Sequence, residues 1–476
     1  MVRAMTANDL PLATGVDRPS PRVWRAEFVG TLALAWPIAL TQLGQVAMMT
    51  TDLALVGRLG EQALAGSALG HIVFFTCFVF GMGIVAAVAP LTAQAYGARD
   101  PRMVRRSLRV GLWAALMLGL PFTVIQFHGE DLLLASGQTP ESAALGGRYL
   151  LGLGWSLVPS WVFISLRNFM GAVNRPEPAL WITLAAIPAN GLIAYALIHG
   201  AWGLPRLDLL GAGVATTIVN ICMCAAALWI VARRNPFRKY QVLGHFWRAD
   251  WRLFGKLIEI GAPISGTFLL EYGLFAAAGL LMGWISTPAL AAHQVALQVA
   301  AVMFMVPFGI GMAATVRVGH AVGRRDPDDA RRAGFAAIAL GFIFMATMTL
   351  IVTIWRHDIP LLFLGGGAGS AGDSARIAAM LLLLGATFFI ADGVQAIVAG
   401  ALRGLNDTRI PLVYSALSFW VIGFTSAYGL AFVLGLGAAG VWMGLSIGLT
   451  IYAILLVGRF QRLTRRAFLT ELTKAA

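Results

Sequence analysis

The sequence has 476 residues, of which 58% are hydrophobic and only 12% are charged. A soluble domain carries about twice that charged share, so the composition argues against a soluble enzyme and predicts an integral membrane protein. The formal net charge of +13 would indicate a nucleic-acid partner in a soluble chain. Here the basic residues are explained by their loops, so we expect the lipid bilayer, and no nucleic acid, as partner.

Twelve apolar segments are long enough to cross about 30 Å of hydrocarbon as helices. Because lipid offers the backbone no hydrogen-bond partners, helices are the expected structure. The predicted fold class is therefore an all-α integral membrane protein with twelve transmembrane helices. In chain order the segments are 28–56, 63–92, 107–127, 143–165, 178–199, 209–232, 253–284, 289–316, 333–354, 376–402, 410–432 and 436–458.

The basic residues mark one side of the membrane. With the N-terminus inside, 30 of the 35 Lys and Arg residues fall on the inner side and 5 on the outer side. Such an excess is typical of cytoplasmic loops, so we expect both termini in the cytoplasm. Residues 1–27 lack a separate apolar core before a cleavage site, which indicates a cytoplasmic tail and not a signal peptide. The outer residues are Arg58, Arg148, Arg206, Arg356 and Arg376.

The chain contains a duplication. Residues 57–101 align without a gap on 283–327, an offset of 226, and 14 of the 45 positions are identical. With six spans in each copy, both copies enter the bilayer in the same sense, which predicts two six-helix lobes related by a pseudo-twofold axis along the membrane normal. The predicted divisions are a tail (1–27), an N-lobe (28–232), a cytoplasmic linker (233–252), a C-lobe (253–458) and a second tail (459–476).

Three acidic residues lie within the apolar spans: Asp52, Glu271 and Asp392. A charge near the bilayer centre costs roughly 2.5–3.5 kcal/mol on insertion scales, and such groups usually face a protein interior or a water-filled cavity. The duplication places Gln45 at the position of Glu271 and Ala278 at that of Asp52. The shared fold therefore does not itself require an acid at either position.

The neighbours of these acids favour cation binding. Phe268 and Phe275 lie at i−3 and i+4 from Glu271, and Phe388 and Gln395 lie at i−4 and i+3 from Asp392. Carboxylates beside aromatic rings suit an organic cation. We hypothesise that the acids exchange a proton or a metal ion for substrate. The alternative is that they pair with an Arg or hydrogen-bond to neighbouring helices and only hold the spans together.

Two neutral residues, Asn190 and Thr216, could supply oxygens to a sodium or proton site with Asp52, although hydrogen bonding between helices is equally compatible with them.

The glycine-rich stretch 365–372 lacks the Lys-Ser/Thr ending of a phosphate-binding loop. Uphill transport would then require an ion gradient or the membrane potential. We find no enzyme motif in a span, so we expect no enzymatic activity and no cofactor besides a coupling ion.

Several motifs together resemble the multidrug and toxic compound extrusion (MATE) transporters, specifically their bacterial NorM-type branch. The resemblance covers the chain after about residue 25. The motifs are Thr51-Asp52-Leu53 before Val56-Gly57-Arg58-Leu59-Gly60, Pro90-Leu91-Thr92-Ala93-Gln94-Ala95-Tyr96-Gly97-Ala98, Ala291-Ala292-His293-Gln294, Phe304-Met305-Val306-Pro307, Arg317-Val318-Gly319-His320 and Leu402-Arg403-Gly404-Leu405-Asn406-Asp407.

The resemblance implies an alternating-access antiporter of the bacterial inner membrane that exports cationic drugs or dyes in exchange for Na⁺ or H⁺. It places the family's acids on Asp52, Glu271 and Asp392, which are also the Na⁺ candidates, and its N-lobe cation site on Asn190 and Thr216. We expect a monomer. The alternative is a flippase for lipid-linked precursors, or an exporter of another substrate class, on a related scaffold; it would require a cationic cavity for phosphate. The predicted substrate-binding residues are Glu271, Tyr272, Phe268, Phe275, Asp392, Phe388, Gln395 and Gln294.

Overall fold

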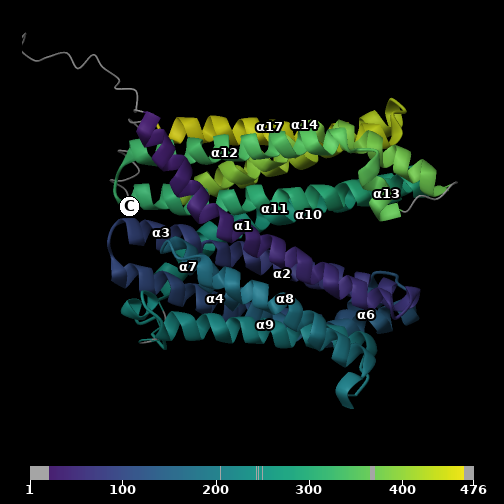
Figure 1. The fold of residues 1–476 in the computed structure, drawn as a ribbon, viewed down its shortest axis with the longest axis horizontal. Helices are drawn as coiled ribbons and strands as arrows, with labels where there is room; N and C mark the ends of the chain where they lie inside the picture. The colour runs from purple at the N-terminus through teal and green to yellow at the C-terminus, as the bar shows by residue number, and fades with distance from the viewer. Residues whose placement is uncertain are drawn as a thin grey trace, which may run out of the picture.

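The computed structural model describes residues 21–203, 205–242, 244, 246–248, 250–364 and 370–465. Within these ranges all regular structure is helical, and 12 helical segments are long and apolar enough to cross a membrane. Figure 1 shows them running side by side in two bundles. The predicted all-α class and the predicted number of spans are therefore confirmed.

The helices of the N-terminal half are α1 (Pro21–Gly57), α2 (Glu61–Ala86), α3 (Val88–Gly97), α4 (Pro101–Phe127), α5 (Gly129–Ala135), α6 (Pro140–Leu153), η1 (Gly154–Ser156), α7 (Leu157–Ala172), α8 (Glu177–His199), η2 (Ala201–Gly203) and α9 (Asp208–Arg233). A short helix, η3 (Phe237–Tyr240), lies in the predicted linker.

The helices of the C-terminal half are α10 (Trp251–Ile285), α11 (Thr287–Gly323), α12 (Pro327–Ile354), α13 (Asp358–Leu364), α14 (Ser370–Gly404), α15 (Arg409–Ser415), η4 (Ala416–Phe424), α16 (Thr425–Tyr428), η5 (Gly429–Val433) and α17 (Gly437–Leu463). Elements α15 to η5 form one span, Arg409–Val433, in which η4 and η5 are π-helical.

The helices extend beyond the apolar segments that predict them. The first begins at Pro21 instead of 28, and the fourth span continues to Ala172 instead of ending at 165. Two short helices, α5 and α13, are absent from the prediction. The reason is that an apolar window reports only the part of a helix that lies in hydrocarbon, whereas the helical hydrogen bonds continue into polar sequence.

One turn is built twice, at equivalent positions of the two halves. Asp100 and Asp326 cap α4 and α12 by accepting hydrogen bonds from backbone amides, and each is followed by a proline at the first helical position. The residues just before them, Arg99 and Arg325, have φ angles of 57° and 59°. The offset of 226 found in the sequence therefore also relates backbone conformations.

The two lobes meet through pairs of glycines that the same offset relates. A Cβ at Gly83 would overlap Ser265 of α10, and a Cβ at its equivalent, Gly309, would overlap Ala39 of α1. Likewise, a Cβ at Gly97 would overlap the backbone of His320, and one at Gly323 would overlap Gln94. Since 39 and 265, and 94 and 320, also differ by 226, the contacts exchange under the predicted pseudo-twofold axis.

The first helix of each half contributes to both cores. Leu34, Ala35 and Ile38 of α1 pack in the core of the C-terminal half, whereas Met48 and Val56 of the same helix pack in the N-terminal core. In Figure 1, α1 crosses from one bundle to the other. Helix α10 does the reverse, because Leu257 and Ile264 lie in the N-terminal core and Leu274 and Leu281 lie in the C-terminal core.

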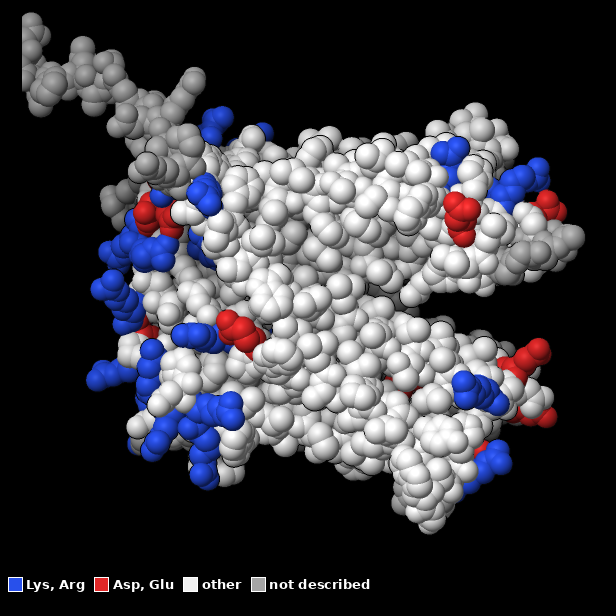
Figure 2. Space-filling model, in the orientation of Figure 1, with Lys and Arg blue, Asp and Glu red and all other residues white. Residues whose placement is uncertain are grey.

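The two ends of the molecule differ. Figure 2 shows Lys and Arg gathered at one end, where the lobes are in contact, and the lobes parted at the opposite end. We call these the basic end and the open end. On the face shown in Figure 2, a broad band with very few charged side chains separates them, as expected for the part that faces hydrocarbon.

Candidate functional site

The N-lobe acid, Asp52, is held by two neutral side chains from other helices. Asn190 of α8 donates its amide Nδ2 to Asp52 Oδ1, and Thr216 Oγ1 of α9 donates to Asp52 Oδ2 at 3.1 Å. Asn190 is fully buried and Thr216 is half-buried. The structure therefore brings together the three residues that the sequence assigned to one cation site.

The oxygens around Asp52 fit a small hard cation. The Oδ1 atom of Asn190 is buried and has no hydrogen-bond partner, so turning its amide by 180° would present a second oxygen beside the carboxylate. With the Thr216 hydroxyl, this makes a set of carboxylate, amide and hydroxyl oxygens of the kind that hard cations prefer. No group of three or more His, Cys, Asp or Glu side chains suited to a metal lies elsewhere in the described ranges.

The C-lobe acids, Glu271 and Asp392, share one amide. Gln395 Nε2 donates to Glu271 Oε1 at 2.9 Å and to Asp392 Oδ1 at 3.2 Å. Asp392 and Gln395 lie one turn apart on α14 and are buried, and Glu271 on α10 is half-buried. None of the three intramembrane acids forms an ion pair within 4.0 Å of Lys or Arg among the described residues. Glu271 nevertheless lies close enough to Arg403 of α14 for the two charges to interact.

The predicted aromatic neighbours lie in different environments. Tyr272 is half-buried and packs on Phe75 of α2, with ring centroids 5.3 Å apart. Phe275 contacts Phe388 with centroids 6.0 Å apart, but Phe388 is fully buried against Trp442. Gln294 is exposed on α11. Contact of Phe388 with a substrate therefore stays a prediction, and it would require movement of the C-lobe core.

Two arginines in the transmembrane helices were missed at the sequence level. Arg167 of α7 is buried and donates to Gln42 Oε1 at 2.6 Å and to Gln45 Oε1 at 3.2 Å. Arg403 of α14 lies over the ring of Phe268, 4.8 Å from its centroid. Both arginines line a pocket between the lobes, together with Phe268. The signal was present for Arg167, because it follows the predicted span 143–165 by only two residues.

The basic end is closed by polar contacts between the lobes. Gln94 Nε2 donates to the Gly404 carbonyl at 2.9 Å, and its pseudo-symmetry equivalent, His320, donates Nε2 to the Ala172 carbonyl at 2.7 Å. Asn406 Nδ2 donates to Gln94 Oε1 at 2.8 Å. Because donors and acceptors come from both halves, these bonds hold the lobes together at this end.

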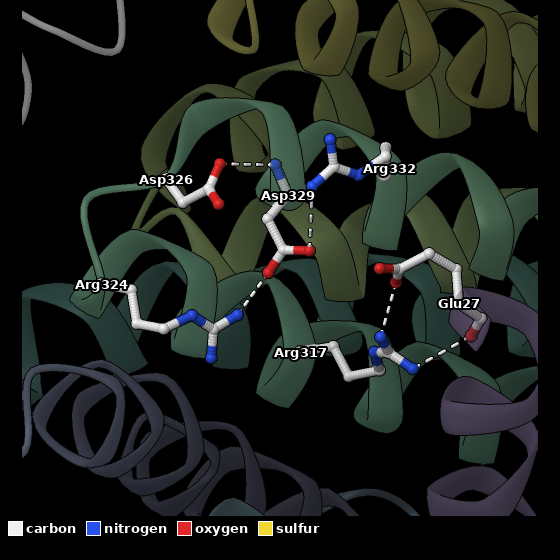
Figure 3. Close-up of polar contacts among 6 residues, drawn as sticks. All are labelled: Glu27, Arg317, Arg324, Asp326, Asp329 and Arg332. Carbon is white, nitrogen blue, oxygen red and sulfur yellow. Dashed lines mark hydrogen bonds and ion pairs between the residues drawn. The ribbon is translucent and has the colours of Figure 1, made fainter. Parts of the chain in front are cut away.

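An ion pair adds to this closure. Arg317 of α11 donates to the Glu27 carboxylate of α1 at 2.5 Å and to the Glu27 carbonyl at 3.0 Å. Figure 3 shows Asp329 of α12 beside them, bridging Arg324 and Arg332. Glu27 and Arg317 are only 9% and 20% exposed. We call this pair the α1 latch, because it joins the start of the first helix to the opposite half.

A second ion pair fixes the start of α10. Arg106 of α4 contacts Asp250, which caps the helix by accepting from the Leu253 amide. Burial alone would raise the pKa of Asp250, but the hydrogen bonds from Arg106 and Leu253 outweigh burial and hold this pKa below its usual value. The pair therefore stabilises the attachment of α10 to the N-terminal half above the range in which Asp250 takes up a proton.

Comparison with known families agrees with this architecture. The MatE family model matches residues 37–196 and 263–429, so its two matches start 226 residues apart. The chain belongs to the MatE family. It is 60% identical over 468 residues to "Probable multidrug resistance protein NorM" of Rhodopseudomonas palustris, covering 98% of both chains. It is 58% identical to the protein of that name in Bradyrhizobium diazoefficiens, covering 92% of this chain and 94% of the relative.

Solved structures share the fold of this MatE protein. The crystal structure of the eukaryotic MATE transporter AtDTX14 superposes with a TM-score of 0.85 at 20% identity, over 95% of this chain and 99% of that one. A structure described as the outward-facing conformation of a multidrug resistance MATE family transporter superposes with a TM-score of 0.84 at 17% identity, over 92% and 97%. At this identity the likeness concerns the fold alone.

Proposed function

We propose that this MatE protein is a multidrug antiporter that exports hydrophobic organic cations in exchange for Na⁺ or H⁺. The observation that carries the proposal is the set of three intramembrane acids, Asp52, Glu271 and Asp392, whose hydrogen-bond partners are neutral. A buried carboxylate that is not neutralised by an ion pair is costly in its charged form, and the charge of Arg403 near Glu271 offsets only part of that cost. A cation that binds and leaves would complete it, and the names of the relatives support drugs as that cation.

The mechanism is competition for the same negative charge. The free carboxylates of Glu271 and Asp392 attract an organic cation, and the half-buried ring of Tyr272, on the same helix as Glu271, is a candidate to pack against that cation. Binding of a proton or Na⁺ removes that attraction and releases the substrate. Because ion and drug favour opposite states of one equilibrium, the gradient of the ion drives the drug outward.

The two ends supply the alternating access. In this proposal the basic end, with its excess of Lys and Arg, faces the cytoplasm. The two termini would then be cytoplasmic, and the open end would face the outer side of the bacterial inner membrane. With the basic end closed by the α1 latch and the open end parted (Figure 2), the structure corresponds to an outward-facing state. Export then requires a second state in which the α1 latch breaks.

The flippase alternative has one supporting observation, the presence of Arg167 and Arg403 in the pocket between the lobes. Such a cationic feature is what a phosphate-bearing substrate would need. Against it stand the three intramembrane acids, Asp52, Glu271 and Asp392, whose hydrogen-bond partners are neutral, and relatives named for drug resistance. The relatives likewise argue for a transporter and against an enzyme.

The test is efflux of a fluorescent organic cation from liposomes that contain the purified protein. An imposed Na⁺ gradient and an imposed pH gradient are compared at matched membrane potential. We expect one of them to drive the dye, which names the coupling ion, and Glu271→Gln and Asp392→Asn variants to lose this response. If neither gradient moves the dye while the protein is folded, cation antiport is wrong, and an anionic lipid-linked substrate becomes the next to test.

A further inference from the structure

A groove runs between α8 and α9 at their basic-end halves. It has a volume of about 1020 Å³, which is the size of a ligand site. Its walls are almost entirely apolar, and several wall residues are small and reachable from outside: Ala185, Ala189, Cys222 and Ala226. By contrast, neighbouring outward-facing positions of the same helices carry large side chains such as Leu184 and Ile221. Small residues therefore hollow the surface that faces the bilayer.

The groove ends in charged side chains. Arg175, just before α8, and Arg234, just after α9, both line it and are exposed. Neither forms an ion pair with a described acidic residue, and the Arg234 guanidinium lies 5.5 Å from the ring centroid of Trp229. Glu177 is the one acid of the lining, so this end carries a net positive charge.

We propose that the groove binds one anionic phospholipid, with the phosphate between Arg175 and Arg234 and an acyl chain along the apolar walls. In a bilayer this surface faces acyl chains, and the arginines lie at the end where cytoplasmic headgroups are found. Basic pockets between transmembrane helices on the cytoplasmic side are suited to anionic headgroups. Trp181 and Trp229, both largely exposed, lie on the same helices and are typical of that interface.

The lipid would lie behind the N-lobe cation site. Ala186 and Met223, which line the groove, are buried on the same two helices that supply Asn190 and Thr216 to Asp52. An acyl chain in the groove fills the space between α8 and α9. It thereby supports the helix pair that positions the partners of Asp52.

The experiment is a titration of the purified full-length protein with phosphatidylglycerol, phosphatidylethanolamine or phosphatidylcholine, read by native mass spectrometry. We expect one tightly bound phosphatidylglycerol, with an affinity about tenfold above that of phosphatidylcholine, equivalent to about 1.4 kcal/mol. The Arg175→Gln/Arg234→Gln double variant should lose this preference. The Ala226→Trp variant, which fills the groove and keeps the arginines, should lose the bound lipid itself.

The control is an Arg238→Gln/Arg252→Gln double variant, which removes two exposed arginines that do not line the groove. It should retain the preference for phosphatidylglycerol. Equal binding of the three lipids overturns the proposal, because the groove then has no preference for an anionic headgroup. An equal loss in the control variant also overturns it, because the preference then comes from general surface charge. Retention of the lipid by a folded Ala226→Trp protein, verified by an unchanged melting temperature, also overturns it.

Discussion

At the scale of single residues, the carboxylates of the two lobes are held in different ways. Asp52 accepts hydrogen bonds from an amide and a hydroxyl on two other helices, whereas Glu271 and Asp392 share the amide of Gln395. Neutral donors offset only part of the cost of a buried charge. In the proposed mechanism a proton, a metal ion or a bound substrate supplies the remainder, so we expect these positions to respond to all three.

Asp52→Asn tests the N-lobe site. The substitution preserves size and keeps one accepting oxygen for the hydrogen bonds from Asn190 or Thr216, but it removes the exchangeable charge. The drug should then lose its driving ion, and gradient-driven dye efflux should fall by roughly tenfold or more. The measurement is efflux per inserted protein in liposomes.

The matched control is Asp208→Asn, at an exposed acid near the start of α9 that pairs with Arg206. This variant should transport like the unmodified protein. If Asp52→Asn inserts normally and exports dye as fast as the control, the assigned role of Asp52 is incorrect.

Sequence reasoning located some of these residues and not others, for identifiable reasons. The acids are conspicuous because charge is rare in apolar spans, and helical spacing placed Gln395 beside Asp392. Asn190 and Thr216 were assigned as neutral oxygen donors within apolar spans, and the family resemblance pointed to the same two positions. Arg167 escaped because the predicted fourth span ended at 165, while its helix continues to Ala172. The direction in which Phe388 points could not be predicted, because both faces of its helix are apolar.

At the scale of helices, α1 joins two functional regions. Its second half carries Asp52 into the N-lobe cation site, and its first half carries Glu27 to Arg317 in the opposite lobe. If Asp52 binds a cation as proposed, that binding and the closure of the basic end act on the same helix, which contains Pro37 in its interior. This gives a physical link between the ion and the state of the transporter.

Arg317→Gln should weaken closure of the basic end. Removing one partner of a buried ion pair costs about 3–5 kcal/mol. Since Arg317 retains some exposure, we expect a smaller effect: the ratio of open to closed basic ends should rise about tenfold, equivalent to about 1.4 kcal/mol. Spin labels at the exposed positions Arg102 and Arg331, one in each half, should report a larger population of long distances.

A control for the α1 latch is Arg376→Gln, which removes an exposed pair with Asp373 within one helix. Its distance distribution should match that of the unmodified protein. An unchanged distribution in Arg317→Gln would show that the α1 latch does not hold the lobes together.

Gly97→Ala and Gly323→Ala test the pseudo-symmetric contact between α3 and α11. A Cβ at either position would overlap backbone atoms of the other lobe, and overpacking of this kind costs about 1–3 kcal/mol. Both variants should favour separation at the basic end in the same distance measurement. In the control Gly255→Ala on α10, the added Cβ would meet nothing within 4 Å, so the distances at the basic end should stay unchanged. Equal behaviour of all three variants would show that the close contacts at Gly97 and Gly323 do not hold the lobes together.

At the scale of the whole molecule, the duplication made the architecture predictable. One offset of 226 relates sequence, capped turns, interlobe glycines and the two family matches. Which end is open could not be predicted, because both states of an alternating-access protein use the same helices and the same apolar pattern.

The two lobes differ in the acids that they carry at equivalent positions, since Glu271 corresponds to Gln45 and Asp52 to Ala278. We infer that this divergence separates the two acid sites functionally.

The central claim is that ion and drug are exchanged through one equilibrium, and exchange in reverse tests it most directly. Liposomes with the purified protein receive a steep gradient of fluorescent organic cation and no ion gradient, and uptake of Na⁺ or H⁺ against the drug flux is recorded. Since coupling is reciprocal, the dye gradient should drive the ion uphill in the opposite direction, and Asp52→Asn should abolish that movement. Dye that crosses through the protein without any counter-movement of Na⁺ or H⁺ would contradict antiport.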